Sequence, residues 1–311
     1  MRFIVCGFGS IGRRHVNNLI KLGYKDIIIV TKQKIKKKYP IFKIVNRIED
    51  GLKLKPNIAL ICNATSLHDE SIILCAKNNC NLFVEKPISS TTKYEKIINN
   101  LIKKKKLTNM VGYMMRFHPA IIKLIKLINN KDVGRIFYVH TVWGEYLPNW
   151  HPNENYKNSY ASKKVLGGGV SLTLSHDLDL LKHIFGAPKI VFKLNSNKSK
   201  LKLNVDTHSN FLIKFKNDIY CSAHLNYLMK KPQRYIKLIG EDGEIYFDYY
   251  KNKISVNKEN SIKIYKFKKF KRNKMFIDEI QYFIECVKKK IKCKPSIAES
   301  FNLLREFKIK Y

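Results

Sequence analysis

The sequence predicts an α/β protein in which a parallel-sheet domain is followed by a domain with a mainly antiparallel sheet. In the first third of the chain, short apolar runs alternate with helix-like segments, which is typical of βαβ units around a buried parallel sheet. After Gly134 this alternation gives way to long runs of β-forming residues. The change of pattern predicts a first domain over residues 1–118 and a second domain over residues 119–311.

The helices and strands of the first domain follow from the spacing of its apolar residues. Thr92 and Glu95 have the spacing of a capping box, so we expect a helix to begin at Thr92. Pro119 suits the first turn of another helix, over residues 120–128. A further helix is expected at residues 9–22, and strands at residues 3–6, 27–30, 58–62, 82–84 and 110–113.

The second domain is expected to be rich in strands. Glu241-Asp242-Gly243 has the composition of a hairpin turn between two of them. Two amphipathic helices, at about residues 275–290 and 296–306, end the chain. The β-forming runs lie at residues 135–143, 189–195, 210–216, 219–228, 234–239, 244–250, 253–256 and 261–267.

Lysine dominates the charge of the chain. Sixty Lys and Arg residues against 24 Asp and Glu give a net charge of +36, yet only nine of the basic residues are Arg. Because phosphate and base recognition favours the guanidinium fork, we expect no specific nucleic-acid partner, and binding driven by bulk charge is a minor alternative. No apolar run approaches the about 18 residues of a membrane span, and the seven cysteines include no CxxC pair. These features predict a cytoplasmic protein with buried thiols and no membrane partner.

A GxGxxG pattern lies directly after the first expected strand and opens the first expected helix. This context is the one that a dinucleotide-binding turn requires. The first glycine permits the tight turn, the second lets the backbone approach a pyrophosphate, and the third allows close packing of helix and strand. We therefore predict cofactor binding by Gly7, Gly9, Ser10, Ile11, Gly12 and Arg13.

The end of the second strand indicates which dinucleotide is bound. An Asp or Glu at that position would accept a hydrogen bond from the ribose 2′-hydroxyl of NAD, but this sequence has Thr31 and Lys32. Together with Arg13, these residues would suit a 2′-phosphate. NADP(H) is therefore the preferred cofactor and NAD(H) a possible one; alternatively, Lys32 is simply one more surface lysine.

An ordered set of motifs resembles the Gfo/Idh/MocA family, the glucose–fructose oxidoreductases. The set comprises the glycine pattern, Glu85-Lys86-Pro87, the segment 112–119 (GYMMRFHP), and a triple glycine at 167–169 followed by His176 and Asp179. The resemblance covers essentially the whole chain. It implies a Rossmann domain joined to an α/β domain with a large open sheet, and a homo-oligomer, either a dimer or a tetramer. It also implies NAD(P)-dependent hydride transfer on sugars, nucleotide sugars or related polyols.

The same resemblance implies that Lys86 and His176 are the catalytic residues. Lys86 would contact both cofactor and substrate, and Glu85 would contact the cofactor. His176 would bind the substrate and act as general acid and base. His176 is expected in the helix that begins after the triple glycine, and Asp179, three residues further on, could orient its ring. The alternatives are a loop lysine before a proline and a histidine packed within a helix. Family members usually carry an Asp where this sequence has Thr173, whose hydroxyl can bind a substrate but cannot act as a carboxylate base.

Four further residues follow strands of the first domain. Arg116 and His118 are predicted to bind substrate, with a salt bridge as the alternative role of Arg116. Thr65 and His68 are predicted near the nicotinamide ribose, although a histidine at a helix start is equally consistent with the pattern.

A long polar and aromatic segment over residues 143–163 precedes the triple glycine. Loops of this length in compact domains are often functional, and aromatic rings beside hydroxyl partners suit a sugar. The alternative is a loop that packs or contacts another subunit. Substrate contacts are predicted for Trp150, His151, Tyr156, Tyr160 and Lys163.

The functional prediction is hydride transfer between nicotinamide and a secondary alcohol or ketone of a carbohydrate-like small molecule. The alternative is a dinucleotide-binding sensor or partner protein without turnover, because Thr173 replaces the usual Asp. No metal site is expected, since His176 and His183 are seven residues apart and the chain has no HExxH pattern. Serine hydrolase chemistry is not supported either, because no GxSxG pattern occurs.

Overall fold

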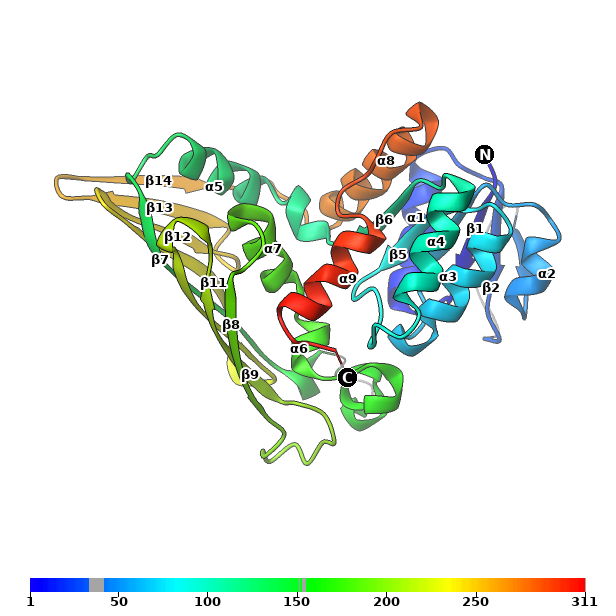
Figure 1. Cartoon of the computed structure of the whole chain (residues 1–311), viewed down its shortest axis with the longest axis horizontal. Coiled ribbons are helices and arrows are strands. Elements are labelled where there is room, and N and C mark those ends of the chain that lie inside the picture. Colours follow the sequence, from blue (N-terminus) through cyan, green and yellow to red (C-terminus); the bar gives the residue numbers. More distant parts are fainter. Residues whose placement is uncertain (34–41, 151, 153–154, 311) are drawn as a thin grey trace. The chain divides into compact units, whose positions relative to one another are not determined.

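A computed structural model describes residues 1–33, 42–150, 152 and 155–310 of the chain, drawn in Figure 1. The chain divides into two compact units. Unit 1 consists of Met1–Met114 with Asn273–Leu304, and unit 2 of Met115–Arg272 with Arg305–Ile309. The return of residues 273–304 to unit 1 differs from the predicted contiguous second domain.

Unit 1 is built on a six-stranded sheet in the order β3-β2-β1-β4-β5-β6, with every neighbouring pair parallel. Strands β1, β2 and β4 are buried along their whole length, which explains their unbroken apolar sequences. The order reverses between β1 and β4, and this is the switch point at which open α/β sheets bind ligands. The strands are β1 (Phe3–Cys6), β2 (Ile27–Val30), β3 (Phe42–Val45), β4 (Ile58–Ile61), β5 (Asn81–Glu85) and β6 (Asn109–Gly112).

The helices of unit 1 come from both ends of the chain. Helix α8, drawn in orange in Figure 1, packs against α1 and β6, while α3 packs against α4 and β5. The helices are α1 (Ser10–Lys21), α2 (Ile48–Leu52), α3 (His68–Lys77), α4 (Glu95–Lys105), α8 (Asn273–Lys289) and α9 (Ile297–Glu306). The expected start at Thr92 is wrong, because α4 begins at Glu95 with Tyr94 as its N-cap.

Unit 2 contains an eight-stranded sheet in the order β14-β13-β12-β11-β7-β10-β9-β8. Its pairs are antiparallel except for β7 and β10, which run parallel. Burial alternates along β9, as in a sheet with one packed face and one solvent face. The strands are β7 (Ile136–Tyr146), β8 (Ile190–Ser196), β9 (His208–Lys214), β10 (Tyr220–Asn226), β11 (Leu228–Gly240), β12 (Gly243–Asp248), β13 (Lys253–Lys258) and β14 (Ser261–Lys266).

In the described part of unit 2, the α-helices that accompany this sheet are α5 (Pro119–Asn129), α6 (Val170–Thr173) and α7 (His176–Phe185). Helix α5 contacts β13, and α6 contacts β9 and β10. The segment after the triple glycine was expected to form one helix containing His176. It forms two instead, because the helix breaks after Thr173 and restarts at His176.

The predicted fold class is confirmed by the two sheets. All seven cysteines lie within the described residues as buried free thiols, as expected. Across residues 1–33, 42–150, 152 and 155–310, no helix combines the length and the apolar character needed to cross a bilayer.

Candidate functional site

The glycine turn joins the end of β1 to the start of α1. Gly7 has a φ of +99°, and a Cβ there would lie 2.7 Å from the backbone nitrogen of Asn63. A Cβ on Gly12 would lie 2.1 Å from the carbonyl oxygen of Gly7, so this position admits only glycine. At Gly9, by contrast, a Cβ would meet no heavy atom of the described chain within 4 Å. The turn is therefore closed around Gly7 and Gly12 and open at Gly9, next to the N-terminus of α1, which suits the approach of a pyrophosphate.

The end of β2 lies beside this turn. The Arg13 guanidinium on α1 donates from Nη2 to Oε1 of Gln33 at 3.0 Å and from Nε to the carbonyl of Phe8 at 3.2 Å. Thr31 is buried, and its hydroxyl accepts a 3.1 Å hydrogen bond from the backbone N–H of Gln33, while Lys32 is exposed. Arg13 thus contacts the segment after β2 through Gln33, and residues 31–33 carry no carboxylate. Binding of a 2′-phosphate by Thr31, Lys32 and Arg13 stays a prediction.

Thr65 begins a 3₁₀ turn and His68 begins α3 directly after it, and both residues are buried. The His68 Nδ1 lies 3.0 Å from the carbonyl of Pro87 and 3.2 Å from that of Ile88, and Nε2 lies 3.1 Å from the carbonyl of Asn63. Burial lowers the pKa of His68, and the contacts with the three backbone carbonyls oppose this shift. These contacts make His68 a link between the β4–α3 turn and the loop after β5; its predicted role at the ribose stays a prediction.

Lys86 directly follows β5. The preceding residue, Glu85, is buried, and its Oε1 lies 2.6 Å from Nε2 of His15 on α1. Its other oxygen accepts a 3.3 Å hydrogen bond from the backbone N–H of Lys86. The carboxylate predicted to meet the cofactor is thus engaged with α1 and with the Lys86 backbone, which holds the start of the Lys86 loop against the helix of the glycine turn.

In unit 2, Arg116 and Asp179 form a bidentate pair. The guanidinium donates from Nε at 2.8 Å and from Nη2 at 2.7 Å to the two carboxylate oxygens. Both oxygens of Asp179 accept from Arg116, and the orientation of His176 by Asp179 stays a prediction. The salt bridge that we kept as the alternative role of Arg116 is present, and substrate binding by Arg116 stays a prediction.

His176 begins α7 and lies beside an aromatic and ionic group that sequence reasoning missed. Its ring centroid is 5.9 Å from that of Trp143, and the Arg234 guanidinium lies 3.7 Å from the Trp143 centroid. Arg234 also donates to Oδ1 of Asp177 from Nη2 at 2.7 Å and from Nε at 3.1 Å. Burial raises the pKa of Asp177, and Arg234 opposes this by stabilising the carboxylate. Trp143 was part of the aromatic segment seen in the sequence, but no local pattern pointed to Arg234.

Thr173 ends α6 and is buried. Its hydroxyl donates to the carbonyl of Gly169 at 2.8 Å and exchanges a hydrogen bond with the hydroxyl of Tyr227, a fully buried residue. The Trp150 ring packs edge-on against Tyr227, with centroids 5.4 Å apart. Thr173 and Trp150, both predicted at the substrate, therefore meet at Tyr227, a residue that the sequence analysis did not select.

His118 is fully buried. Its Nδ1 accepts a 3.1 Å hydrogen bond from the N–H of Ala120, so the side chain caps the N-terminus of α5. The ring lies 4.5 Å from that of Phe270 and 5.6 Å from that of Phe247. Burial, followed by the charge of Arg234, lowers the pKa of His118 to about 4. These contacts support a structural role, and the predicted substrate role stays a prediction.

The remaining loop residues are not gathered at one place by the contacts of the structure. Tyr156 donates a long, 3.5 Å hydrogen bond to the carbonyl of Leu201. Tyr160 is exposed and Lys163 is half-buried. His151 lies outside the described residues, so its predicted substrate contact rests on the sequence alone.

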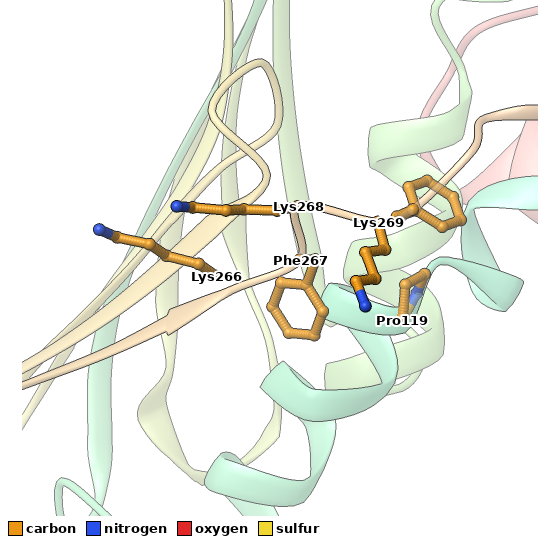
Figure 2. Close-up of a pocket in the computed structure, with 6 residues that line it drawn as sticks. Pro119, Lys266, Phe267, Lys268 and Lys269 are labelled. Carbon is orange, nitrogen blue, oxygen red and sulfur yellow. The ribbon is translucent and has the colours of Figure 1, made fainter.

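Unit 2 also has a hollow of about 520 Å³, shown in Figure 2. Its apolar lining comes from Pro119, Phe267 and Phe270. Its basic lining comes from Lys266, Lys268 and Lys269. The predicted substrate residues are not among those that line it in the described chain.

A parallel sheet with a glycine turn open at Gly9, beside the N-terminus of a helix, defines a dinucleotide-binding protein. The profile of the oxidoreductase family with an NAD-binding Rossmann fold matches residues 1–113, and the profile of the GFO/IDH/MocA C-terminal domain matches residues 121–246. The chain therefore belongs to the Gfo/Idh/MocA oxidoreductases, as the motifs predicted.

Individual relatives include sugar and polyol enzymes. The chain is similar to scyllo-inositol 2-dehydrogenase (NAD(+)) of Bacillus subtilis, with 28% identity over 197 residues that cover 60% of this chain and 54% of the relative. It is also similar to 2,7-anhydro-N-acetylneuraminate hydratase of Escherichia coli, with 25% identity over 61% of this chain and 50% of the relative. The chain thus matches about half the length of these curated relatives.

Among solved structures, levoglucosan dehydrogenase in complex with NADH and levoglucosan superposes with a TM-score of 0.84. The match covers 99% of this chain and 95% of that chain at 16% identity. At this identity the likeness establishes the fold.

Proposed function

We propose that the protein is an NAD(P)-dependent oxidoreductase that transfers hydride between nicotinamide and a secondary alcohol or ketone of a sugar, nucleotide sugar or related polyol. The glycine turn carries this proposal, because it is closed around Gly7 and Gly12 and open at Gly9, where a pyrophosphate needs space. The relatives named for activity on inositol and levoglucosan support the substrate class.

Lys86 and His176 are the proposed proton-handling residues. The nicotinamide ring, when bound, accepts or gives the hydride. The Lys86 ammonium stabilises the alkoxide that develops on the substrate oxygen, and the His176 imidazole takes the hydroxyl proton or returns it. Glu85 fixes the Lys86 backbone through its 3.3 Å hydrogen bond. Thr173 cannot replace the family's usual carboxylate as a base, so it leaves proton transfer to Lys86 and His176.

We further propose that NADP(H) is preferred over NAD(H). Thr31, Lys32 and Gln33 follow β2 without a carboxylate, and Arg13 hydrogen bonds to Gln33 there. Two cations beside the adenosine ribose favour a 2′-phosphate. Lys32→Asp tests this preference. The affinity for NADPH, obtained from the thermal stabilisation that NADPH causes, should fall at least about tenfold, while stabilisation by NADH should persist. Equal stabilisation of the wild type by both dinucleotides would refute the preference.

A homo-oligomer in the cytoplasm is the proposed state. The solvent face of the unit 2 sheet exposes large apolar side chains, which isolated monomers rarely present. These include Ile190, Phe192, Leu194 and Leu212. The seven buried thiols suit a reducing compartment. Sedimentation of the purified chain tests the assembly, since a monomer at micromolar concentration would contradict it.

The activity is tested by following nicotinamide absorbance with a panel of inositols, sugars and nucleotide sugars. Lys86→Ala and His176→Ala should each lower kcat by about 10²-fold or more, which is a larger effect than either variant has on cofactor affinity. Lys93→Ala, an exposed lysine on the same stretch of chain, is the matched control and should keep full turnover.

The second candidate function is a dinucleotide-binding protein without turnover. It is favoured by Thr173, whose hydroxyl is engaged by Gly169 and Tyr227 where the family usually has an Asp. Cofactor-induced stabilisation without hydride exchange on any substrate of the panel would select this function. Absence of stabilisation by NAD⁺, NADH, NADP⁺ and NADPH would overturn both functions.

A further inference from the structure

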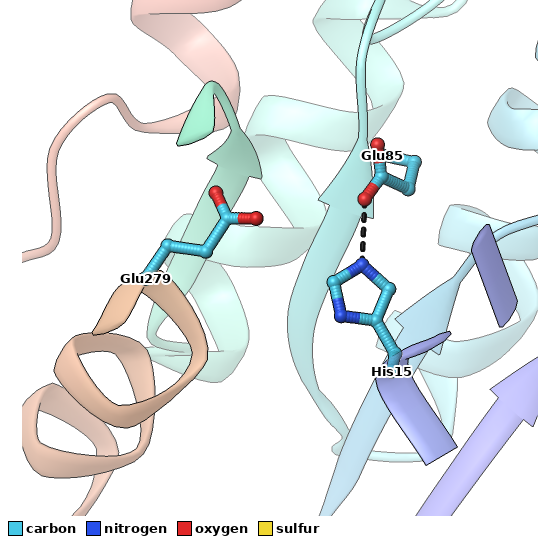
Figure 3. A group of neighbouring side chains, drawn as sticks. All are labelled: His15, Glu85 and Glu279. Carbon is cyan, nitrogen blue, oxygen red and sulfur yellow. Dashed lines mark hydrogen bonds and ion pairs between the residues drawn. The ribbon is translucent and has the colours of Figure 1, made fainter. Parts of the chain in front are cut away.

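Three buried side chains converge in unit 1, as Figure 3 shows. His15 comes from α1, Glu85 from the end of β5 and Glu279 from α8. One ligand atom from each residue lies within 4.8 Å of the other two. His15 and Glu279 are fully buried and Glu85 is 7% exposed, so the group is shielded from solvent.

Several polar atoms of this group have no hydrogen-bond partner among the described residues. His15 and Glu85 share one contact of 2.6 Å between Nε2 and Oε1. Both carboxylate oxygens of Glu279 and the Nδ1 of His15, although buried, lack a hydrogen-bond partner among the described residues. Burial and the neighbouring Glu85 raise the pKa of Glu279 well above its ordinary value. A proton on Glu279 would relieve the charge, but the resulting acid would be buried with no acceptor at hydrogen-bond distance among the described residues.

Two aromatic rings pack against the histidine of the group. The rings of Phe83 and Phe276 pack against His15, with centroids 5.3 and 6.2 Å away. In such surroundings an unpaired carboxylate is strongly destabilising. A cation placed among the three side chains would neutralise it and would engage the unpartnered oxygens of Glu279.

We propose that His15, Glu85 and Glu279 bind one divalent transition-metal ion, with zinc as the first candidate. An imidazole and two carboxylates are ligands that zinc accepts at about 2.0–2.2 Å. The imidazole disfavours calcium and magnesium, which prefer oxygen ligands. Bonds of this length place ligand atoms about 3.3 Å apart, so binding requires the His15–Glu85 contact to open slightly. The ion would tie α1, β5 and α8 together.

The site is tested on the full chain, purified without an affinity tag and stripped with a chelator. Wild type should bind one Zn²⁺ per chain by mass spectrometry of the metal, and the ion should raise Tm by about 5 °C or more at a hundredfold excess over Kd. Co²⁺ should bind at the same site and give the intense visible absorption of a tetrahedral ion.

Glu279→Gln keeps the size of the side chain and removes its charge, so it should abolish the metal-induced rise in Tm. Glu285→Gln, at an exposed position of the same helix, is the matched control and should retain the rise. Two outcomes overturn the proposal: a wild type that binds none of Zn²⁺, Co²⁺ and Mn²⁺, or a Glu279→Gln variant that binds them as tightly as wild type. These readouts do not depend on turnover, so the metal site and the proposed oxidoreductase activity can fail separately.

Discussion

Arg116 and Asp179 lie 63 residues apart in sequence and form a two-point ion pair at 2.7 and 2.8 Å. Their side chains are 12% and 3% exposed, so the pair is nearly free of solvent screening. Removing one partner would leave the other charge buried. We therefore expect Asp179→Asn to lower the free energy of unfolding by about 3 kcal/mol, measured by urea denaturation.

The control for this pair is Asp218→Asn, which breaks the exposed contact between Lys214 and Asp218. Surface pairs contribute little, so its unfolding midpoint should match that of wild type. If Asp179→Asn unfolds like wild type but raises KM for an active substrate, Arg116 serves mainly in substrate binding.

The glycine turn predicts opposite outcomes for two similar substitutions. Gly9→Ala adds a methyl group where the described chain leaves space, so the variant should fold normally and bind NADPH at least about tenfold more weakly. Gly12→Ala forces a methyl group to within 2.1 Å of the Gly7 carbonyl, so this variant should be destabilised even without cofactor. Thermal unfolding with and without NADPH measures both effects. Normal cofactor binding by Gly9→Ala would contradict the pyrophosphate site.

His118 predicts an acid-sensitive fold. Its pKa of about 4 in the folded chain lies below the ordinary value of 6.5. The unfolded chain therefore takes up a proton between pH 6.5 and 4 that the folded chain does not, and stability is lost as the pH falls. The total loss should approach about 3 kcal/mol.

His118→Asn isolates this effect, because Asn can cap α5 but does not titrate. Urea unfolding at pH 7 and pH 5 should show a larger loss of stability on acidification in wild type than in the variant. Equal losses would show that other groups cause the acid sensitivity.

We expect the protein to be less stable against unfolding when the hydroxyl of Thr173 is removed. Thr173→Val retains the shape but leaves the Gly169 carbonyl and the Tyr227 hydroxyl without this partner, so the free energy of unfolding should fall by about 1–3 kcal/mol. Thr173→Ser keeps the hydroxyl and should remain closer to wild type. An increase in KM for Thr173→Val with unchanged stability would instead assign the hydroxyl to substrate binding.

The sequence predicted regular elements well because their apolar periodicity is local. Strands β1, β2 and β4 have unbroken apolar runs, and GxGxxG gave the turn at Gly7 to Gly12 directly. The short strand β3, with Lys43 in its middle, has no such run and was missed. The parallel pairing of β7 with β10 was also beyond local patterns, because strand order depends on how distant segments pack.

Side-chain partners were predicted less well than the positions of the side chains. His176 and Asp179 have helical spacing, yet Asp179 pairs with Arg116, which only the tertiary fold brings near. Arg234 meets Asp177 and Trp143 for the same reason. His15, Glu85 and Glu279 come from three separate stretches of sequence, so metal-ligand spacing rules could not find them.

The return of residues 273–304 to unit 1 determines when each unit can finish folding during synthesis. Domains usually fold as they leave the ribosome, beginning with the N-terminal one. Here α8, with Met275, Phe276 and Phe283 in its buried face, is synthesised after all the strands of both sheets. Residues 305–309 belong to unit 2, so that unit also needs residues that follow α8 in the sequence. A nascent chain therefore carries two unfinished cores until these residues emerge, and premature termination anywhere before α8 would yield a product with neither core complete.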